Sequence, residues 1–231
     1  MKIIGIIGGM SWESTLNYYK YINQGIKSRL GGLHSAKLCL VSVDFAEIAS
    51  LQQQGDWSQM TAILVQAGHA LRAAGAECIV IATNTMHKVA TEVEHEVGLP
   101  LLHIADATGQ ALQAQHHQQV ALLGTKFTMQ QRFYLERLER LGIECLVPTL
   151  AEQDDIHRII YDELCQGEIK LQSKQRYLDI IARLHEQGAS AIILGCTEIA
   201  LLVEAQDCNV PLFDTTALHA QAAVEFALSS Y

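Results

Sequence analysis

The sequence predicts an α/β protein built from two similar parallel-sheet domains. Short runs rich in Val, Ile and Leu alternate with longer amphipathic stretches along the chain. The two halves of the chain also carry matching motifs in the same order. Continuous apolar runs are typical of strands buried on both faces, and their alternation with helices favours parallel sheets covered by helices.

Each apolar run is expected to form a strand and each amphipathic stretch a helix. In chain order, the predicted strands are 2–7, 36–43, 77–82, 99–104, 119–123, 143–147, 189–194 and 210–213. The predicted helices are about 13–30, 57–74, 86–97, 105–116, 128–141, 151–165, 171–187, 198–206 and 215–229. Glycines follow several of these helices, at the position where a left-handed C-terminal cap is favoured.

An internal repeat indicates how the chain divides. Three pairs of anchors occur in the same order, spaced by 116, 113 and 111 residues: Gly8 with Gly124, Gly75 with Gly188, and Pro100 with Pro211. Three matches in register indicate two copies of one α/β unit, joined near residues 113–118. We expect residues 1–115 with 209–231 to form the first domain and residues 116–208 to form the second.

The composition argues against several classes of protein. The 25 acidic side chains outnumber the 16 basic ones, the net charge is −9, and no Lys/Arg run offsets it, so a nucleic-acid partner is not expected. No apolar stretch approaches the roughly 18 residues that cross a bilayer, and no secretory signal is recognisable, so we expect a cytoplasmic protein with no membrane partner. The six cysteines form no C-x-x-C pair and the ten histidines show no ligand spacing. Neither a disulfide framework nor a metal site is therefore expected.

The repeat places two polar turns at equivalent strand ends. Residues 83–85 (Thr-Asn-Thr) and 196–198 (Cys-Thr-Glu) each follow an apolar strand and precede a helix. Ligands of open parallel sheets bind beyond the carboxyl ends of the strands. If the domains face each other about a pseudo-twofold axis, Thr83 and Cys196 meet across one cleft. Proton-handling groups on opposite sides of a cleft suit inversion at a tetrahedral carbon.

Cys196 is the strongest single candidate for chemistry. It follows Gly195 at the end of a strand and opens a predicted helix, whose N-terminus is expected to lower the thiol pKa toward neutrality. The alternative is a buried, inert thiol. The polar neighbours of both turns are expected to hold a zwitterion, with simple helix capping as their alternative; they are Asn84, Thr85, Thr197 and Glu198.

A glycine-rich turn, residues 8–11 (Gly-Gly-Met-Ser), follows the first predicted strand. It satisfies neither the G-x-G-x-x-G nor the G-x-x-x-x-G-K-[ST] spacing, so it is weak support for a nucleotide. Its expected role is to let backbone amides approach a small anionic group, such as the carboxylate of an amino acid.

Three motifs together resemble the aspartate/glutamate racemase family, and its aspartate racemase branch in particular. They are residues 8–11, residues 83–87 (Thr-Asn-Thr-Met-His) and residues 195–198 (Gly-Cys-Thr-Glu). The resemblance runs over essentially the whole chain. It implies two Rossmann-like domains with the active site in the cleft between them, and racemisation of an amino acid without pyridoxal phosphate, other cofactor or metal. It also implies a homodimer.

The resemblance also implies roles for individual residues. In that family two cysteines at the paired turns act as opposed acid and base; Cys196 matches the second, and Thr83 occupies the position of the first. The matching substrate contacts are Met10, Gln52, Thr83, Asn84, Thr85, Cys165, Thr197 and Glu198.

Two departures from the family pattern affect what is expected. Thr83 is a far weaker acid than cysteine, so the two directions of racemisation are expected to be unequal. Gln52 and Cys165 stand where aspartate-specific relatives tend to carry basic residues, so uncharged side chains are expected to be tolerated beside acidic ones. If only acidic substrates are accepted, Lys126 is the first residue expected to bind their side chain.

Two other functions are left open by the sequence. One is a different cysteine-dependent reaction in the same fold, such as isomerase or lyase chemistry through Cys196. The other is a non-catalytic module that binds an amino acid. Incorporation of solvent deuterium at Cα distinguishes a racemase from a binding module.

Overall fold

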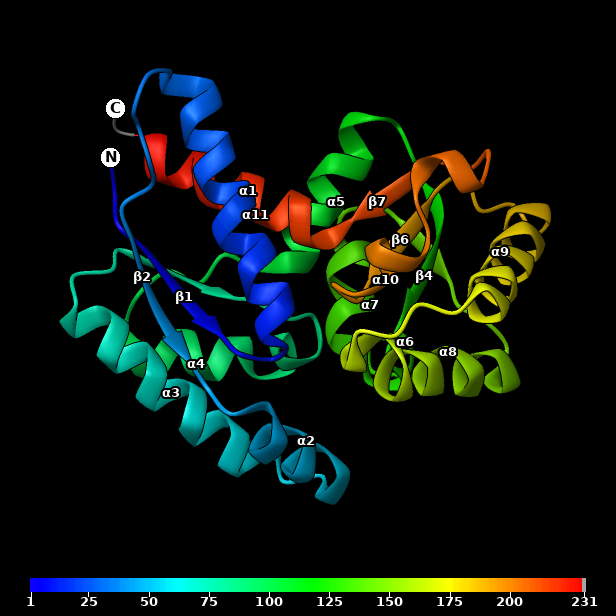
Figure 1. The fold of residues 1–231 in the computed structure, drawn as a ribbon, viewed down its shortest axis with the longest axis horizontal. Helices are drawn as coiled ribbons and strands as arrows, with labels where there is room; N and C mark the ends of the chain where they lie inside the picture. Colours follow the sequence, from blue (N-terminus) through cyan, green and yellow to red (C-terminus); the bar gives the residue numbers. More distant parts are fainter. Residues whose placement is uncertain (230–231) are drawn as a thin grey trace. The chain divides into compact units, whose positions relative to one another are not determined.

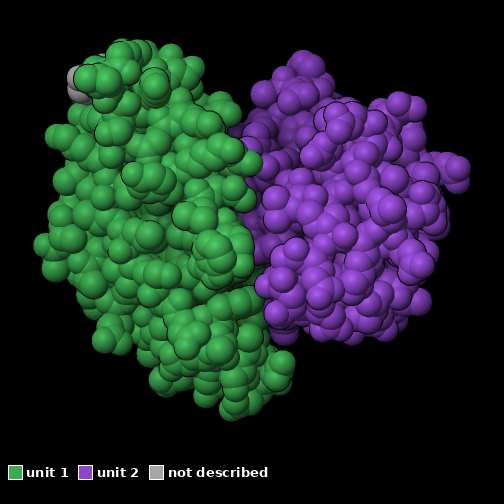
Figure 2. Space-filling model, in the orientation of Figure 1, with its two compact units in different colours: residues 1–103, 219–231 green, residues 104–218 purple. Residues whose placement is uncertain are grey.

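The computed structural model of the protein describes residues 1–229. It contains two parallel β-sheets covered by helices (Figure 1), which confirms the predicted α/β class. The chain forms two compact units (Figure 2): the first holds Met1–His103 and the described residues from His219 onwards, and the second holds Ile104–Leu218.

The first unit has a three-stranded sheet in the order β2-β1-β3. Its strands are β1 (Ile4–Gly8), β2 (Leu38–Ser42) and β3 (Cys78–Ile81). Its helices are α1 (Trp12–Leu30), α2 (Phe45–Gln54), α3 (Trp57–Ala73), the 3-10 helix η1 (Thr85–Val89), α4 (Ala90–Val97) and the later part of α11 (Thr215–Leu228).

Strand β1 separates two apolar clusters in this unit. Ile4 and Ile6 belong to the cluster formed with α1 and α11, while Ile7 belongs to the cluster formed with α2, α3 and α4. Helices α1 and α11 accordingly lie on one side of the sheet and α3 and α4 on the other (Figure 1). The side chains of the central strand alternate between the two faces of the sheet, and helices bury both faces, as expected for a parallel α/β layer.

The second unit has a four-stranded sheet in the order β5-β4-β6-β7. Its strands are β4 (Gln119–Gly124), β5 (Glu144–Leu146), β6 (Ile192–Gly195) and β7 (Leu212–Asp214). Its helical segments are α5 (Ile104–Ala114), α6 (Lys126–Gln130), α7 (Arg132–Arg140), α8 (Leu150–Asp162), η2 (Leu164–Gln166), α9 (Leu171–Glu186), α10 (Ile199–Leu202) and η3 (Ala205–Asp207).

The two sheets share one strand plan. In each unit the first strand pairs in parallel with the second strand on one side and with the third on the other. Gly8 and Gly124 are the last residues of β1 and β4, and the two polar turns follow β3 and β6. The sequence repeat is therefore a repeat of this α/β plan.

The unit limits differ from the expected domain limits at two elements. Helix α5 contacts α7, and β7 pairs in parallel with β6, so both lie in the second unit. The expected limits placed residues 104–115 and 209–218 in the first domain. The pairing of β7 explains the difference, because a strand belongs to the sheet that it extends.

The structure differs from the prediction at several elements. Residues 99–104 form one isolated parallel bridge, Ile79 with Leu101, instead of a strand. Helix α2 was not predicted, although Asp44 accepts from the amide of Ala46 as its N-cap and Gly55 ends it in the left-handed conformation. The predicted helix 128–141 divides at Gln131, whose backbone is extended. The predicted helix 198–206 is replaced by the single turn of α10 and the short 3-10 helix η3.

A buried polar pair ties helix α11 to the first unit. The hydroxyl of Tyr18 and Nδ1 of His219 lie 2.8 Å apart, and Nε2 of His219 lies 2.7 Å from the carbonyl oxygen of Leu102. A carbonyl only accepts, so Nε2 carries the proton and Nδ1 accepts from Tyr18. Burial lowers the pKa of His219 from 6.5 to about 4.

This depressed pKa predicts an acid-sensitive contribution to stability. The unfolded chain takes up a proton on His219 near pH 6.5 and the folded chain only near pH 4, so the contribution is present above pH 6.5 and lost as the pH falls toward 4. The loss is expected to be about 3 kcal/mol. Urea unfolding at pH 7 and pH 4 should show it in the wild type and not in His219→Gln. Equal acid losses in both proteins would contradict the assignment.

Within residues 1–229 no helix is both long enough and apolar enough to span a membrane.

Candidate active site

The first polar turn of the first unit follows strand β1. Ser11 caps α1 by accepting from the amide of Ser14, and the amide of Gly9 donates to the hydroxyl of Thr15 over 2.8 Å. Gly9 has a φ of +92°, and a Cβ added to it would lie 2.2 Å from the carbonyl oxygen of Val43. The glycine is therefore required both by its conformation and by the close approach of the next loop.

Substituting this glycine is expected to destabilise the chain. Gly9→Ala should lower the free energy of unfolding by at least about 2 kcal/mol, because it adds a left-handed alanine and a clash with main-chain atoms. Gly55→Ala is the matched control: Gly55 also has a positive φ, but its added Cβ would meet nothing within 4 Å. It should cost only about 1 kcal/mol. Similar midpoints of urea unfolding for the two variants would contradict this explanation.

The second polar turn of this unit follows β3. Asn84 and Thr85 are buried, while Thr83 is half-buried. The carbonyl of Thr83 accepts from Nδ1 of His87 over 2.7 Å, and the hydroxyl of Ser14 donates to the carbonyl of Ala82. The Ser14 bond joins the start of α1 to the end of β3, so the two turns of this unit adjoin each other.

Two further predicted residues lie against these turns. Gln52 is on α2, is 6% exposed, and its side-chain amide donates to the thioether of Met86 over 3.5 Å. The side chain of Met10 is buried in the same apolar cluster as Met86. The structure thus brings Met10, Gln52 and the 83–85 turn to one region of the first unit.

The corresponding turn of the second unit follows β6 and is a compact hydrogen-bonded cluster. The thiol of Cys196 donates to Oε2 of Glu198 over 2.9 Å, and the hydroxyl of Thr197 donates to the same oxygen over 2.7 Å. Cys196 is 9% exposed, and Thr197 and Glu198 are also buried. One carboxylate oxygen therefore faces the thiol that the sequence singled out.

The expected lowering of the Cys196 pKa is wrong for this structure. Burial and the neighbouring Glu198 carboxylate raise the pKa of Cys196 well above its ordinary value. Helix α10 has only four residues, so the helix-terminus effect that would favour the thiolate is small. Cys196 therefore rests as a thiol, with a carboxylate placed to take its proton.

Cys165 lies close to this cluster. It is on η2, partly buried, and packs against the apolar cluster that contains Cys196. It also contributes to raising the pKa of Cys196. Tyr161 was not predicted, but its pKa is raised by burial and by Cys196, Cys165 and Glu198. The signal in the sequence was spacing, because residues 161 and 165 are four apart in a predicted helix and so share a face.

Lys126 is engaged within the second unit. Its ammonium group forms an ion pair with Asp154, and its amide donates to Nδ1 of His157 over 3.3 Å. The ring of His157 also contacts Tyr161, with ring centroids 4.7 Å apart. A substrate carboxylate at Lys126 would have to compete with Asp154.

The predicted site residues thus fall into two groups, one in each unit. Met10, Gln52 and residues 83–85 belong to the first, and Cys165 and residues 196–198 belong to the second. The opposition of Thr83 and Cys196 stays a prediction. Among residues 1–229 no group of three His, Cys, Asp or Glu side chains is placed to hold a metal ion.

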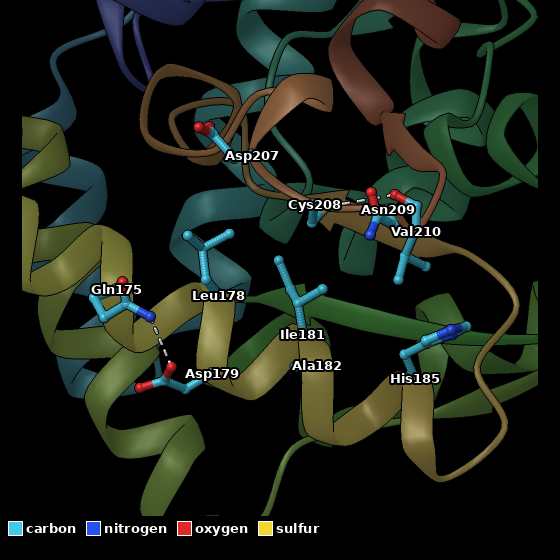
Figure 3. Close-up of a pocket in the computed structure, with 10 residues that line it drawn as sticks. All are labelled: Gln175, Leu178, Asp179, Ile181, Ala182, His185, Asp207, Cys208, Asn209 and Val210. Carbon is cyan, nitrogen blue, oxygen red and sulfur yellow. Dashed lines mark hydrogen bonds between the residues drawn. The ribbon is translucent and has the colours of Figure 1, made fainter.

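A separate hollow of about 410 Å³ lies in the second unit and contains none of the predicted site residues. Side chains of α9 form one wall and residues 207–210 the other (Figure 3). Its surface is largely apolar, through residues such as Leu178, Ile181 and Val210, and Asp179 accepts from Gln175 at its rim. The candidate chemistry is therefore not in this hollow.

The two polar turns lie within a region of the sequence that matches a known enzyme family. The sequence matches the family described as Asp/Glu/Hydantoin racemase over residues 7–223, a span that includes every predicted site residue. The chain belongs to this family. The match confirms the resemblance drawn from the three motifs.

Solved structures agree with this membership. A candidate Asp/Glu racemase from Yersinia pestis is 55% identical, with a TM-score of 0.92 over 99% of this chain and 100% of that one. An aspartate racemase homologue from Pyrococcus horikoshii is 37% identical, with a TM-score of 0.85 over 98% of this chain and 99% of that one. The broad specificity amino-acid racemase RacX of Bacillus subtilis is 23% identical over 174 residues, 75% of each chain. These relatives support an amino-acid racemase.

Proposed function

We propose that this racemase inverts Cα of aspartate, glutamate or related amino acids by two-base proton transfer, with Thr83 and Cys196 as the opposed groups. The observation that carries the proposal is the Cys196–Glu198 contact at the end of β6, at the position equivalent to the Thr83 turn. A thiol beside a carboxylate has an acceptor for its proton. It can therefore act as an acid in one direction and as a base in the other.

The proton balance of the two directions follows from this contact. As an acid, the Cys196 thiol gives its proton to the planar carbanion and becomes a thiolate. As a base, Cys196 first loses its proton to solvent by way of Glu198, over the 2.9 Å hydrogen bond, and the thiolate then takes the α-proton. On the opposite face Thr83 gives its hydroxyl proton to the carbanion when Cys196 is the base. When Cys196 is the acid, Thr83 takes the α-proton as an alkoxide, after its own hydroxyl proton has passed to solvent. The substrate thus gains one proton and loses one, and only the configuration changes.

The remaining site residues are assigned to binding. The glycine turn with Met10, the first polar turn with Asn84 and Thr85, and Thr197 of the 196–198 turn supply amides and hydroxyls for the α-carboxylate and ammonium groups. Gln52 and Cys165 are assigned to the side chain of the substrate.

Exchange and inversion measured together test the proposed function. Each enantiomer of aspartate, glutamate, asparagine, glutamine and alanine is incubated with the enzyme in D2O, and NMR and chiral chromatography follow Cα deuteration and inversion. Inversion accompanied by deuteration is the expected result for at least one substrate. Binding without deuteration would indicate a binding module, and deuteration with loss of a carboxylate or double-bond migration would indicate the other cysteine-dependent reactions.

The neutral residues at the side-chain positions give a prediction about selectivity. Gln52→Arg should raise the preference for aspartate over asparagine by about tenfold, because a guanidinium forms charge-assisted, bidentate hydrogen bonds with a carboxylate. The ratio of kcat/KM values for the two substrates measures this preference. Gln52→Lys is the control, because lysine adds a positive charge but cannot form the bidentate hydrogen bonds of arginine. It should give a smaller rise in the preference for aspartate. An unchanged ratio in both variants would remove residue 52 from side-chain recognition.

We also propose a cytoplasmic homodimer. The functional thiol and five other cysteines are free thiols, which suits a reducing compartment. Helix α1 exposes Trp12, Leu16 and Tyr19 at helical spacing, with 61%, 56% and 54% of each residue accessible, and such a stripe suits a protein interface. Light scattering coupled to size exclusion tests the dimer, and Leu16→Glu should weaken it.

A further inference from the structure

Three buried histidines lie together behind the Thr83 turn. His87 is on η1, His103 ends the 99–103 segment, and His219 is on α11, all in the first unit. Their exposed fractions are 2%, 6% and 0%. The ring of His87 lies edge-on to both others, with centroids 4.6 Å from His103 and 5.3 Å from His219. None of these side chains has a role in the proposed proton transfer.

Hydrogen bonds fix the tautomers of two of these rings. Nδ1 of His87 lies 2.7 Å from the carbonyl oxygen of Thr83, and because a carbonyl only accepts, Nδ1 carries the proton. By the same argument Nε2 of His219 carries the proton that it donates to Leu102. His219 is in turn held by Tyr18, whose hydroxyl donates to Nδ1. The cluster is therefore a chain of oriented rings that ends on the main chain of Thr83.

The His87 bond acts on the residue that carries the candidate acid/base hydroxyl. It spans four residues and closes the turn that leaves β3, and the amide of Thr83 is held by the carbonyl of Ile81 over 2.8 Å. Both main-chain polar groups of Thr83 are thus fixed. A misplacement of about 1 Å in a reacting group lowers rates by about 10²-fold, so the position of this carbonyl matters for the hydroxyl on the same residue.

We propose that His87 is a positioning residue for Thr83, and that His103 and His219 hold its ring in the orientation that donates to the Thr83 carbonyl. The proposal rests on the proposed function, because it gives His87 a role only in the proton transfer that Thr83 carries out. His87 acts through the main chain and does not itself carry the proton. Its loss should therefore impair one face of the reaction and spare the other.

The ratio of deuterium exchange to inversion separates the two faces. For the enantiomer whose α-proton Cys196 removes, the sulfur proton exchanges with D2O, and return of a deuteron to the same face gives exchange without inversion. Inversion needs a proton delivered from the Thr83 face. A defect confined to that face raises the ratio of exchange to inversion, whereas general destabilisation lowers both rates together.

Three substitutions at residue 87 test the hydrogen bond. His87→Phe keeps the ring and removes the donor, and the ratio should rise about tenfold or more. His87→Asn places an amide donor near the Nδ1 position and should restore the ratio to within about twofold of the wild type. His87→Gln places its amide near the Nε2 position instead and should behave like His87→Phe. Circular dichroism reports folding, and if His87→Phe does not fold, the Asn and Gln pair carries the test.

His185→Phe is the matched control. Nδ1 of His185 lies 2.8 Å from the carbonyl of Ala189, an equivalent bond across four residues. Ala189 precedes β6, at the opposite end of that strand from Cys196, so this variant should leave the ratio unchanged. Equal ratios in wild type, His87→Phe and His87→Gln, with exchange and inversion intact in the wild type, would overturn the positioning role. A wild type that neither exchanges nor inverts any substrate would instead overturn the proposed function.

Discussion

Replacing Cys196 by alanine or serine is expected to lower racemisation by at least about 10²–10⁴-fold, the contribution of a positioned acid/base group. Alanine removes the proton carrier. Serine keeps a hydroxyl that can donate to Glu198, but a hydroxyl is a much weaker acid than a thiol. Both variants should therefore lose activity although serine preserves the hydrogen bond. Inversion rates from chiral chromatography measure the loss.

A second cysteine of the same unit provides the control. Cys208 is partly buried, and its thiol donates to the carbonyl of Val210 over 3.5 Å, in the segment that precedes β7. Cys208→Ser should keep kcat within about twofold of the wild type. Retention of activity in Cys196→Ser would contradict the assignment of the thiol as acid/base, provided that circular dichroism shows both variants folded.

The pH dependence of the wild type adds a directional check to this prediction. Burial and Glu198 raise the pKa of Cys196, so the thiolate fraction in the free enzyme is small at neutral pH and grows as the pH rises. Exchange that starts with proton removal by Cys196 should therefore rise with pH. This rise should be absent in Cys196→Ser, because the serine hydroxyl does not ionise in the same range.

The sequence predicts the architecture well because apolar burial is visible in a single chain. Strands β1, β3, β4 and β6 are fully or almost fully buried, and each was expected from a continuous apolar run. Helix α2 was missed although Asp44 and Gly55 mark its ends, because its apolar face is narrow: Ile48 is its one fully buried apolar residue. The segment 99–104 pairs with β3 only through the isolated bridge at Leu101, so it does not form a strand.

The candidate site is predicted less completely, because its chemistry depends on side-chain contacts that form only in the folded chain. The helix that was expected to stabilise the Cys196 thiolate ends after one turn, and the Glu198 side chain returns to the thiol. Neither event is encoded in local spacing. The contact between Gln52 and Met86 likewise joins α2 to η1 across a stretch of chain that contains helix α3 and strand β3. Only the fold brings those residues together.

Thr83→Cys is expected to raise deuterium exchange in the direction where residue 83 must remove the α-proton, by up to about 10²-fold. The threonine hydroxyl stays protonated near neutral pH, whereas a thiol has an ordinary pKa of about 8.5 and supplies some thiolate. The half-buried position of Thr83 leaves room for the sulfur to meet solvent, unlike the buried Cys196. The accelerated direction should be the slow one in the wild type.

Direction-resolved deuteration of each enantiomer measures this change, and Thr83→Ser is its control. Serine keeps the hydroxyl and the main-chain bond to His87, so the inequality of the two directions should persist in that variant. The equilibrium between enantiomers fixes only the ratio of the overall efficiencies, so the exchange pattern is free to respond to the new thiol. If Thr83→Cys leaves both exchange rates unchanged, residue 83 is a binding contact. The proton on that face would then come from a bound water or from His87, and the unequal chemistry of the two turns would have to arise from Cys196 alone.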